Sequence, residues 1–354
     1  MSDHFVTEFG HRIDFVPGYF ERNSFYAHFA KHNWQGRKPY ECDAQAGKPL
    51  GYYMVAKDWV LFSALVSFLS RLGLLKKWHS GIDLGGAEGT VIRLFKAAGL
   101  LDCATNLDIF DFSRVAPDAY FTEFLHRTAA PDWANSATHP VTDAINWAKV
   151  HLDYLPMTAP LEGLVVDFPV KPEAETVVAN IYDAHGCYDL IVSNALLEFV
   201  DLDRALPKIR SLIAPGGTFV GNLNLCWCPV VPNGLVGDFP YLFQRLTLND
   251  ARRYFEGHRP EQLFNLEARY SYFHEGKQRP ALSDWMEAFK RNGLKVAGFE
   301  LVSPIRAKRY GDPPKQLLKK PWFNPNEVLR DAHHINQSVT IDDLTATALR
   351  VALV

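Results

Sequence analysis

The sequence has few cysteines and no long apolar run. Its 354 residues include five cysteines, an odd number with no framework spacing, which excludes a disulfide-stapled scaffold and favours a reducing, cytoplasmic setting. The longest apolar run, Trp59 to Leu69, is too short to span a bilayer. The N-terminus lacks the apolar segment of a secretory signal. We therefore expect a soluble cytoplasmic protein that has no membrane partner.

A surplus of charge of one sign is also missing. Lys and Arg number 37 against 40 Asp and Glu, a net charge of −3, which argues against the basic surface of a nucleic-acid-binding protein. Repeats and low-complexity tracts are absent as well. Apolar residues make up 47% of the chain and charged residues 22%, which is ordinary for a globular protein with a sizeable core. The length allows one large domain or two smaller ones.

The most informative stretch that is present runs from Gly81 to Gly89 and reads GIDLGGAEG. An apolar start carries Asp83, glycines follow, and residues 90–99 place apolar side chains at helical spacing. This pattern predicts a strand, a tight turn and a helix. Glycines let the backbone approach a ligand closely, and a helix N-terminus offers unpaired N–H groups. Taken alone, the stretch could equally be a structural turn.

A second strand pattern ends at Asp108, 19 residues beyond Gly89. An acid at the end of the strand next to a glycine turn can accept hydrogen bonds from both ribose hydroxyls of a nucleoside. Asp111 takes this role if the strand ends later. The two features together favour a nucleotide-type ligand.

The spacing of Asp83, Gly85, Ala87 and Gly89 resembles motif I of the class I S-adenosylmethionine-dependent methyltransferases, D/E-x-G-x-G-x-G, with Ala87 in place of the middle glycine. Residues 187–225 resemble the family's fourth strand, the helix after it, a proline-glycine turn and the fifth strand. The resemblance is to small-molecule enzymes like the ubiquinone-biosynthesis methyltransferases, although Phe199 stands where many of them carry histidine. It covers about 80–225, 283–303 and the last strand.

The resemblance implies an α/β fold, a Rossmann-like sheet of seven strands in the order 3-2-1-4-5-7-6, with the last strand antiparallel and helices on both faces. The sequence patterns place its strands at about 80–85, 103–108, 161–168, 188–193, 218–225, 295–302 and 345–354. Helices are expected at about 55–78, 89–99, 248–256 and 283–292, the last capped by Ser283. The helix over 55–78 is apolar nearly all round, which predicts core packing or a homodimer contact, or alternatively a cap over the pocket.

In domain terms, residues 1–79 form an irregular N-terminal arm and a helix, and residues 80–354 form the methyltransferase domain. Three insertions, at about 110–160, 226–265 and 304–343, leave the carboxyl ends of strands. Because ligands of open α/β sheets bind at those ends, we expect the insertions to converge over one pocket.

The resemblance also implies the cofactor, S-adenosyl-L-methionine, and residues that hold it. The expected cofactor-binding residues are Asp83, Gly85, Gly86, Ala87 and Gly89 at the methionine end, Asp108 at the ribose with Ile109 directly after it, Asp167 and Phe168 at the adenine, and Asn194 and Ala195 near the methyl group. For Asp167 and Phe168, an ordinary acid and core aromatic at a strand end is an equal alternative. The sequence SNAL after the fourth strand differs from the N/D-P-P-Y type of nucleic-acid and protein-amide methyltransferases.

Methyl transfer from a sulfonium is a direct displacement, for which the protein supplies alignment, desolvation and, where needed, a general base. Four residues are candidates for the base, of which one at most serves: Glu198, His274, His333 and His334. No metal site is expected, because Cys226 and Cys228 lack the spacing of metal ligands. Six basic residues between Arg306 and Lys320 predict a solvated loop or, as the alternative, contact with an acidic or phosphorylated substrate.

The sequence therefore predicts a methyltransferase that acts on a small aromatic or apolar molecule, with oxygen as the favoured acceptor atom. One rival is a nicotinamide-dependent oxidoreductase, which calls for a G-x-G-x-x-G register that Ala87 and Gly89 do not supply. The other is a non-catalytic S-adenosylmethionine-binding protein, a role that Phe199 leaves open.

Overall fold

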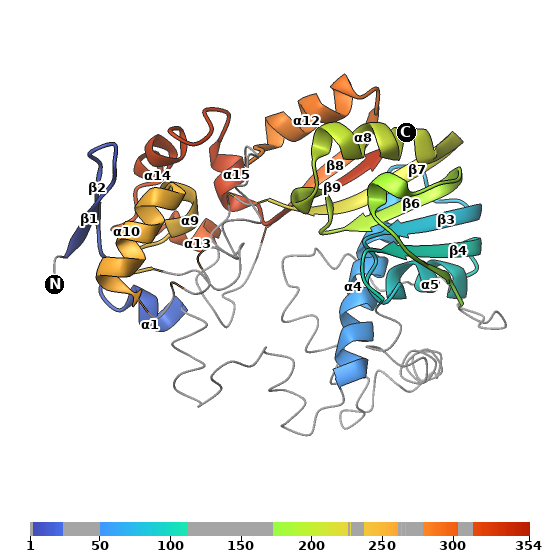
Figure 1. Ribbon diagram of the computed structural model, residues 1–354, viewed down its shortest axis with the longest axis horizontal. Helices are drawn as coiled ribbons and strands as arrows, with labels where there is room; N and C mark the ends of the chain where they lie inside the picture. The colour runs from blue at the N-terminus through green and yellow to red at the C-terminus, as the bar shows by residue number, and fades with distance from the viewer. Residues whose placement is uncertain are drawn as a thin grey trace. The chain divides into compact units, whose positions relative to one another are not determined.

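The computed structural model describes residues 3–23, 50–111, 173–225, 227, 237–260, 263, 266, 279–303 and 314–354 (Figure 1). The chain forms two compact units. The first comprises Met1–Gly36, Asn224–Glu287 and Leu301–Leu349, and the second Arg37–Leu223, Ala288–Glu300 and Arg350–Val354.

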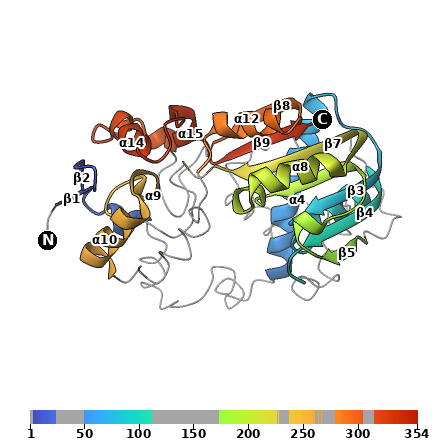
Figure 2. The same ribbon diagram turned by 45° about the horizontal axis from the view of Figure 1, so that its top comes forward.

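A seven-stranded sheet has the order β5-β4-β3-β6-β7-β9-β8 (Figures 1 and 2). Its strands, in chain order, are β3 (Trp78–Leu84), β4 (Leu101–Asp108), β5 (Glu175–Val178), β6 (Tyr188–Asn194), β7 (Ile213–Asn224), β8 (Val296–Val302) and β9 (Ala348–Leu353). Numbered along the sequence of this sheet, the order is 3-2-1-4-5-7-6, so the predicted topology is confirmed.

The first five strands pair in parallel, which brings their carboxyl ends to one edge of the sheet. The last strand runs the other way. Lys295 and Val354 exchange both of their backbone hydrogen bonds, at 3.1 and 2.9 Å, which is the pattern of an antiparallel pair. The predicted antiparallel last strand is confirmed.

Two helices of the second unit, one before β3 and one after it in sequence, accompany the first strand of the sheet. Helix α4 (Leu50–Arg71) ends before Gly73, whose φ of 68° breaks the helix; the helix expected over 55–78 is therefore shorter, since Trp78 already begins β3. Helix α5 (Thr90–Ala97) follows the glycine turn. Phe62 of α4 packs edge-on against Phe95 of α5, with ring centroids 4.9 Å apart.

The third strand of the sheet is not where the sequence pattern placed it. The strand hydrogen-bonded to β4 is β5, at Glu175–Val178, whereas the expected strand at 161–168 lies outside the described residues. β5 is an edge strand with mostly exposed side chains, so it lacks the apolar run that marks a buried strand. The more apolar segment 161–168 was therefore wrongly predicted as the strand next to β4.

Further helices follow β6 and precede β8. The 3₁₀ turn η3 (Leu197–Phe199) leads into α8 (Leu202–Leu212), which is capped by Asp201. Helix α12 (Leu282–Arg291) begins before Ser283, so the predicted cap at Ser283 is wrong. Asp284 serves this end instead, because its Oδ2 accepts a hydrogen bond from the Ala281 N–H at 2.8 Å. The predicted turn at Gly293 is confirmed by its φ of 68°.

The first unit begins with a hairpin where an irregular arm was expected. Strands β1 (His4–Val6) and β2 (Arg12–Asp14) pair antiparallel. The other elements of this unit are α1 (Tyr19–Asn23), α9 (Leu242–Arg245), α10 (Leu248–His258), α13 (Pro314–Leu317), α14 (Pro325–Ala332) and α15 (Ile341–Thr345). Helix α10 confirms the helix predicted at 248–256. Residues of the hairpin, α9, α10 and α14 share one buried apolar cluster that includes Phe5, Phe243, Tyr254 and Val328.

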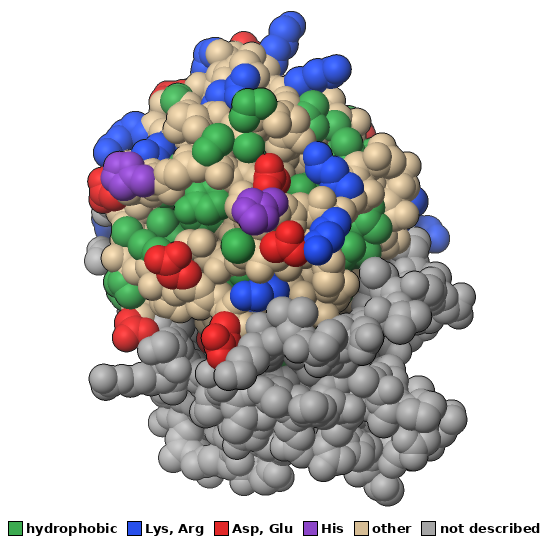
Figure 3. All heavy atoms as spheres, turned by 90° about the vertical axis from the view of Figure 1, so that its right-hand side faces the viewer, with side chains coloured by type: hydrophobic (Ala, Val, Ile, Leu, Met, Phe, Trp, Pro, Cys, Tyr) green, Lys and Arg blue, Asp and Glu red, His purple; other side chains and the backbone are tan. Residues whose placement is uncertain are grey.

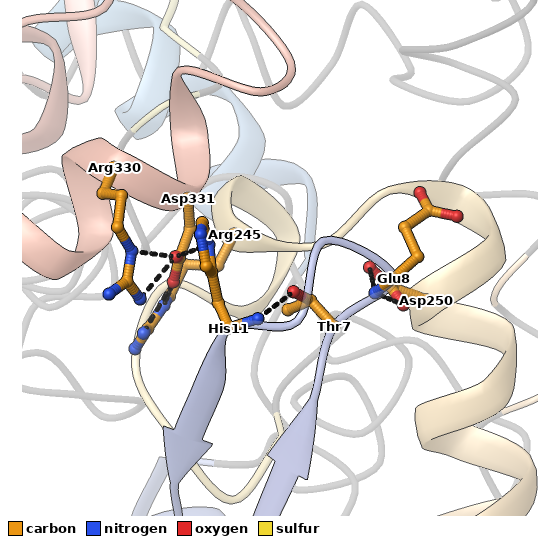
Figure 4. Close-up of polar contacts among 7 residues, drawn as sticks. All are labelled: Thr7, Glu8, His11, Arg245, Asp250, Arg330 and Asp331. Atoms are coloured by element: carbon orange, nitrogen blue, oxygen red, sulfur yellow. Dashed lines mark hydrogen bonds and ion pairs between the residues drawn. The ribbon is translucent and has the colours of Figure 1, made fainter.

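A buried charge network joins the hairpin to α9 and α14 (Figure 4). Asp331 is 2% exposed, and its carboxylate lies 2.9 Å from Nδ1 of His11 and 2.7 Å from Nε of Arg245. At the other side of the hairpin turn, the Glu8 N–H donates to Asp250 of α10 at 2.9 Å. The hairpin is thus fastened to helices that lie more than two hundred residues away in sequence.

On the face shown in Figure 3, acidic, basic and apolar side chains of the described residues are interspersed rather than gathered by sign. This agrees with the small net charge of −3. Within the described part of the chain, no helix combines the length and the apolar character that crossing a bilayer requires.

Candidate functional site

The glycine-rich segment forms a tight turn between β3 and α5. Gly85 (φ 70°), Ala87 (φ 48°) and Gly89 (φ 68°) all adopt left-handed backbone conformations, and Gly89 is the residue before α5. A Cβ on Gly85 would come within 3.0 Å of the Leu196 side chain, which follows β6. The turn therefore packs against the end of the neighbouring strand, and glycine is required there for its φ and for its lack of a side chain.

Two side chains of β4 hold Ala87 from both sides. The Ala87 N–H donates to Oδ2 of Asp108 at 3.0 Å, and Nδ2 of Asn106 donates to the Ala87 carbonyl at 2.8 Å. Positions two apart on a strand face the same side, so one face of β4 satisfies both polar groups of this residue. Asn106 was missed by sequence reasoning; its signal was a polar residue two positions before Asp108, on the same face of the strand.

Asp83 lies beneath the turn and is 2% exposed. Its pKa is raised to about 8, chiefly by burial and also by the charges of Asp58 and Asp108, while a hydrogen bond from the Ile92 N–H acts in the opposite direction. Its Oδ1 has no hydrogen-bond partner among the described residues. A buried carboxyl group of this kind gains most from a ligand that brings a positive charge or a hydrogen-bond donor.

The end of β6 lies beside the turn. The Ser193 hydroxyl donates to the Leu84 carbonyl at 3.1 Å, which ties β6 to β3. Ala195 has a φ of 53°, and its N–H donates to the Asn222 carbonyl at 2.9 Å. Non-glycine residues held in this region carry strain, and such strain is concentrated at functional sites. Asn194 accepts a hydrogen bond from Nδ2 of Asn222 at 3.3 Å.

Large apolar side chains are exposed around this edge of the sheet. Ile109 and Phe110, directly after β4, are 56% and 62% exposed, Val178 at the end of β5 is 56% exposed, and Phe199 in η3 is 40% exposed. Val178 is the register partner of Asp108. A rim of apolar groups beside polar ones is the composition of a small-molecule site.

The residues expected at the adenine, Asp167 and Phe168, lie outside the described residues. Because β5 is the third strand, the residues that follow it are Ala179 and Asn180. The Ala179 N–H donates to the Asp108 carbonyl at 2.9 Å. The Asn180 side chain accepts from the Tyr182 N–H at 3.2 Å and caps the 3₁₀ turn η2 (Ile181–Asp183).

The four candidates for the base fall in different places. Glu198 lies in η3, shortly after the end of β6. His274 lies outside the described residues. In the first unit, Nε2 of His333 is 2.9 Å from the Val339 carbonyl, and the His334 ring stacks on Phe9 with centroids 4.1 Å apart. The catalytic role of each stays a prediction, and among the described candidates only Glu198 follows the end of a parallel strand.

A surface hollow of about 440 Å³ lies elsewhere in the second unit, lined by Tyr182, Asp203, Arg204, Pro207 and Lys208. None of these is a candidate site residue. Arg204 stacks over the Tyr182 ring at 4.0 Å, and Asp203 pairs with Arg291 at 2.8 Å, so these two charged groups of the hollow already have partners within the protein.

The strand order, the glycine turn after the first strand and the acid at the end of the second agree with the Rossmann-like seven-stranded sheet predicted from the sequence. No family model matches the sequence, and comparison with curated proteins finds no match. Solved structures similar to this one include geranyl diphosphate C-methyltransferase from Streptomyces coelicolor A3(2), solved with Mg²⁺, geranyl diphosphate and S-adenosyl-L-homocysteine. It is 12% identical, the match covers 82% of this chain and 78% of that one, and the TM-score is 0.38.

An S-adenosylmethionine-dependent methyltransferase from Mesorhizobium loti is also similar. It is 15% identical, with 82% of this chain and 97% of that chain covered and a TM-score of 0.38. At TM-scores this low the likeness carries no weight beside the strand order and the turn geometry.

Proposed function

We propose that the protein is an S-adenosylmethionine-dependent methyltransferase that acts on a small molecule. The observation that carries the proposal is the arrangement at the carboxyl edge of the sheet. A left-handed turn at Gly85, Ala87 and Gly89 is hydrogen-bonded to Asp108 at the end of the adjacent parallel strand. The turn leaves room for the chain of a ligand, and the acid is placed for a ribose.

The protein residues divide the work of holding the cofactor. Each oxygen of Asp108 already accepts one backbone N–H, from Ala87 and from Phe110 at 3.0 and 3.1 Å, and a carboxylate has capacity for further donors such as ribose hydroxyls. Ile109 offers an exposed apolar surface next to it for the adenine. Buried Asp83 favours the ammonium and sulfonium charges at the methionine end.

Transfer of the methyl group needs the acceptor in line with the methyl carbon and the sulfur, with water excluded. Asn194 and Ala195 end the strand next to the turn, so they border the place where the methyl group would lie. We propose an acceptor with aromatic or apolar surface, because Phe110 and Phe199 are exposed at this edge. Oxygen is the favoured acceptor atom, and Glu198 is the favoured base for removing its proton.

Calorimetric titration of the whole protein with S-adenosylmethionine, S-adenosylhomocysteine and NAD tests the proposal. Saturable binding of the two sulfur nucleosides, with no heat from NAD, is the expected result. Binding of NAD alone would replace the proposal with a nicotinamide-dependent oxidoreductase. If the sulfur nucleosides bind but a panel of small hydroxylated aromatics releases no S-adenosylhomocysteine, a non-catalytic binding protein or a different acceptor class is indicated.

A further inference from the structure

Ala87 stands in place of the middle glycine of the D/E-x-G-x-G-x-G pattern, and its backbone is nevertheless left-handed, with φ at 48°. An L-residue with a Cβ pays a steric cost in this conformation that glycine does not. The conformation persists only where surrounding contacts impose it. The structure must therefore hold Ala87 by other means.

Asn106 supplies one of those contacts, and its position there leaves one of its own polar atoms without a described partner. Its Nδ2 donates to the Ala87 carbonyl at 2.8 Å, while its Oδ1 is buried and has no hydrogen-bond partner among the described residues. The side chain is 2% exposed. A buried acceptor left unpaired destabilises a protein, so filling the strand face is a poor account of an asparagine here.

The side chain of Asn106 also fills the space under the turn. A Cβ on Gly86 would lie 2.3 Å from Oδ1 of Asn106, and one on Gly89 would lie 2.8 Å from its Cγ. The glycines on both sides of Ala87 thus leave room for this one side chain. The glycines of the turn and the asparagine at position 106 of β4 therefore fit together sterically.

We infer that Asn106 is a positioning residue, which holds Ala87 in the left-handed conformation so that the turn is preformed for the methionine end of the cofactor. This inference rests on the proposed function. Asn106 acts through Ala87 and not through contact with the ligand. Its importance for binding therefore depends on the residue at position 87.

A double-mutant cycle tests this dependence, with S-adenosylhomocysteine as the probe in calorimetric titration. Asn106→Leu keeps the approximate size of the side chain and removes the donor to Ala87, and Asn106→Ala removes the whole amide. In the wild-type background we expect each to weaken binding about tenfold, the scale of one lost hydrogen bond and the ordering it supports. Ala87→Gly alone should change affinity by less than about threefold, because glycine adopts the conformation without help.

In the Ala87→Gly background, the same Asn106 substitutions should weaken binding by less than about threefold, since glycine removes the need for the clamp. Equal losses in both backgrounds would overturn the inference, because a merely structural asparagine does not depend on residue 87. Far-ultraviolet circular dichroism and thermal unfolding check that each variant is folded. If Asn106→Ala does not fold, Asn106→Leu, which preserves the size of the side chain, decides alone. A wild-type protein that binds no S-adenosylhomocysteine would refute the proposed function, whereas binding with additive losses would refute only the inference.

Discussion

The Ala87 N–H donates to Oδ2 of Asp108 at 3.0 Å, across the gap between the glycine turn and the end of β4. This bond makes the acid part of the turn as well as a candidate ligand for ribose. A ligand at Asp108 therefore meets a carboxylate whose orientation is already set. Such preorganisation reduces the ordering that binding must impose.

Asp108→Ala should weaken binding of S-adenosylhomocysteine by at least about tenfold, because it removes acceptors for both the ribose and the turn. Asp102→Ala is the matched control, since Asp102 is near the opposite end of the same strand and its ion-pair partners among the described residues are the exposed side chains of Lys77 and His79. Calorimetric titration should show unchanged affinity for that variant. Equal affinity of Asp108→Ala and the wild type would remove Asp108 from the ribose role.

Asp83 should make stability depend on pH. Its pKa is raised to about 8 in the folded protein from an ordinary value of 3.8, so the folded state holds a proton that the unfolded state has lost. The contribution of Asp83 to the free energy of unfolding is therefore fully present below about pH 4. It falls as the pH rises from about 4 to about 8, and the free energy levels off at higher pH. Urea unfolding at pH 5.5 and pH 8.5 measures the fall, and Asp83→Asn should make it smaller. A fall of the same size in Asp83→Asn would assign it to other groups.

The same carboxyl group predicts proton release when a cationic ligand binds. S-adenosylhomocysteine carries an ammonium group that favours the ionised form of Asp83, whereas 5′-methylthioadenosine lacks it. Titration in buffers of different ionisation enthalpy at pH 7 should show protons released on binding of the first ligand and none with the second. The release should vanish in Asp83→Asn; if it persists, the proton comes from elsewhere.

Gly86→Ala should destabilise the protein by about 1–3 kcal/mol, the usual cost of overpacking. The new Cβ would lie 2.3 Å from Oδ1 of Asn106 and 2.6 Å from Cγ of Asp83, both buried. Gly257→Ala is the control, because nothing lies within 4 Å of a Cβ there and the residue is inside α10. That substitution should raise the unfolding midpoint slightly. A neutral Gly86→Ala would show that the turn can move away from Asn106.

Asp331→Ala should destabilise the first unit by about 3–5 kcal/mol, because Arg245 would be left buried without its partner. Asp14→Ala, which breaks only the exposed pair with Arg12, should leave the unfolding midpoint unchanged. Thermal unfolding compares the two variants. Similar midpoints would mean that Arg245 finds another partner.

The strand order could be predicted because local signals, a glycine turn and an acid at a strand end, carry the resemblance that implies it. The role of Asn106 could not be predicted in the same way, because it depends on a hydrogen bond from β4 to Ala87 in the turn after β3. β5 was missed because an exposed edge strand has no apolar run, and residues 161–168 were more apolar. The hairpin at the start of the chain is held by Asp331 and Asp250. Because these residues are far from it in sequence, local patterns could not predict the contacts.

The position of β9 between β7 and β8 has a consequence for synthesis of the chain. Among the described strands, β8 (Val296–Val302) lies at the end of the order and joins the sheet through β9, at residues 348–353. As the chain leaves the ribosome, β8 emerges first and has no sheet partner until residues 348–353 follow. Pairing that waits for a later segment is slow and leaves strand edges open meanwhile. We expect the sheet to close only after those residues are released, which makes this interval the step most open to chaperones.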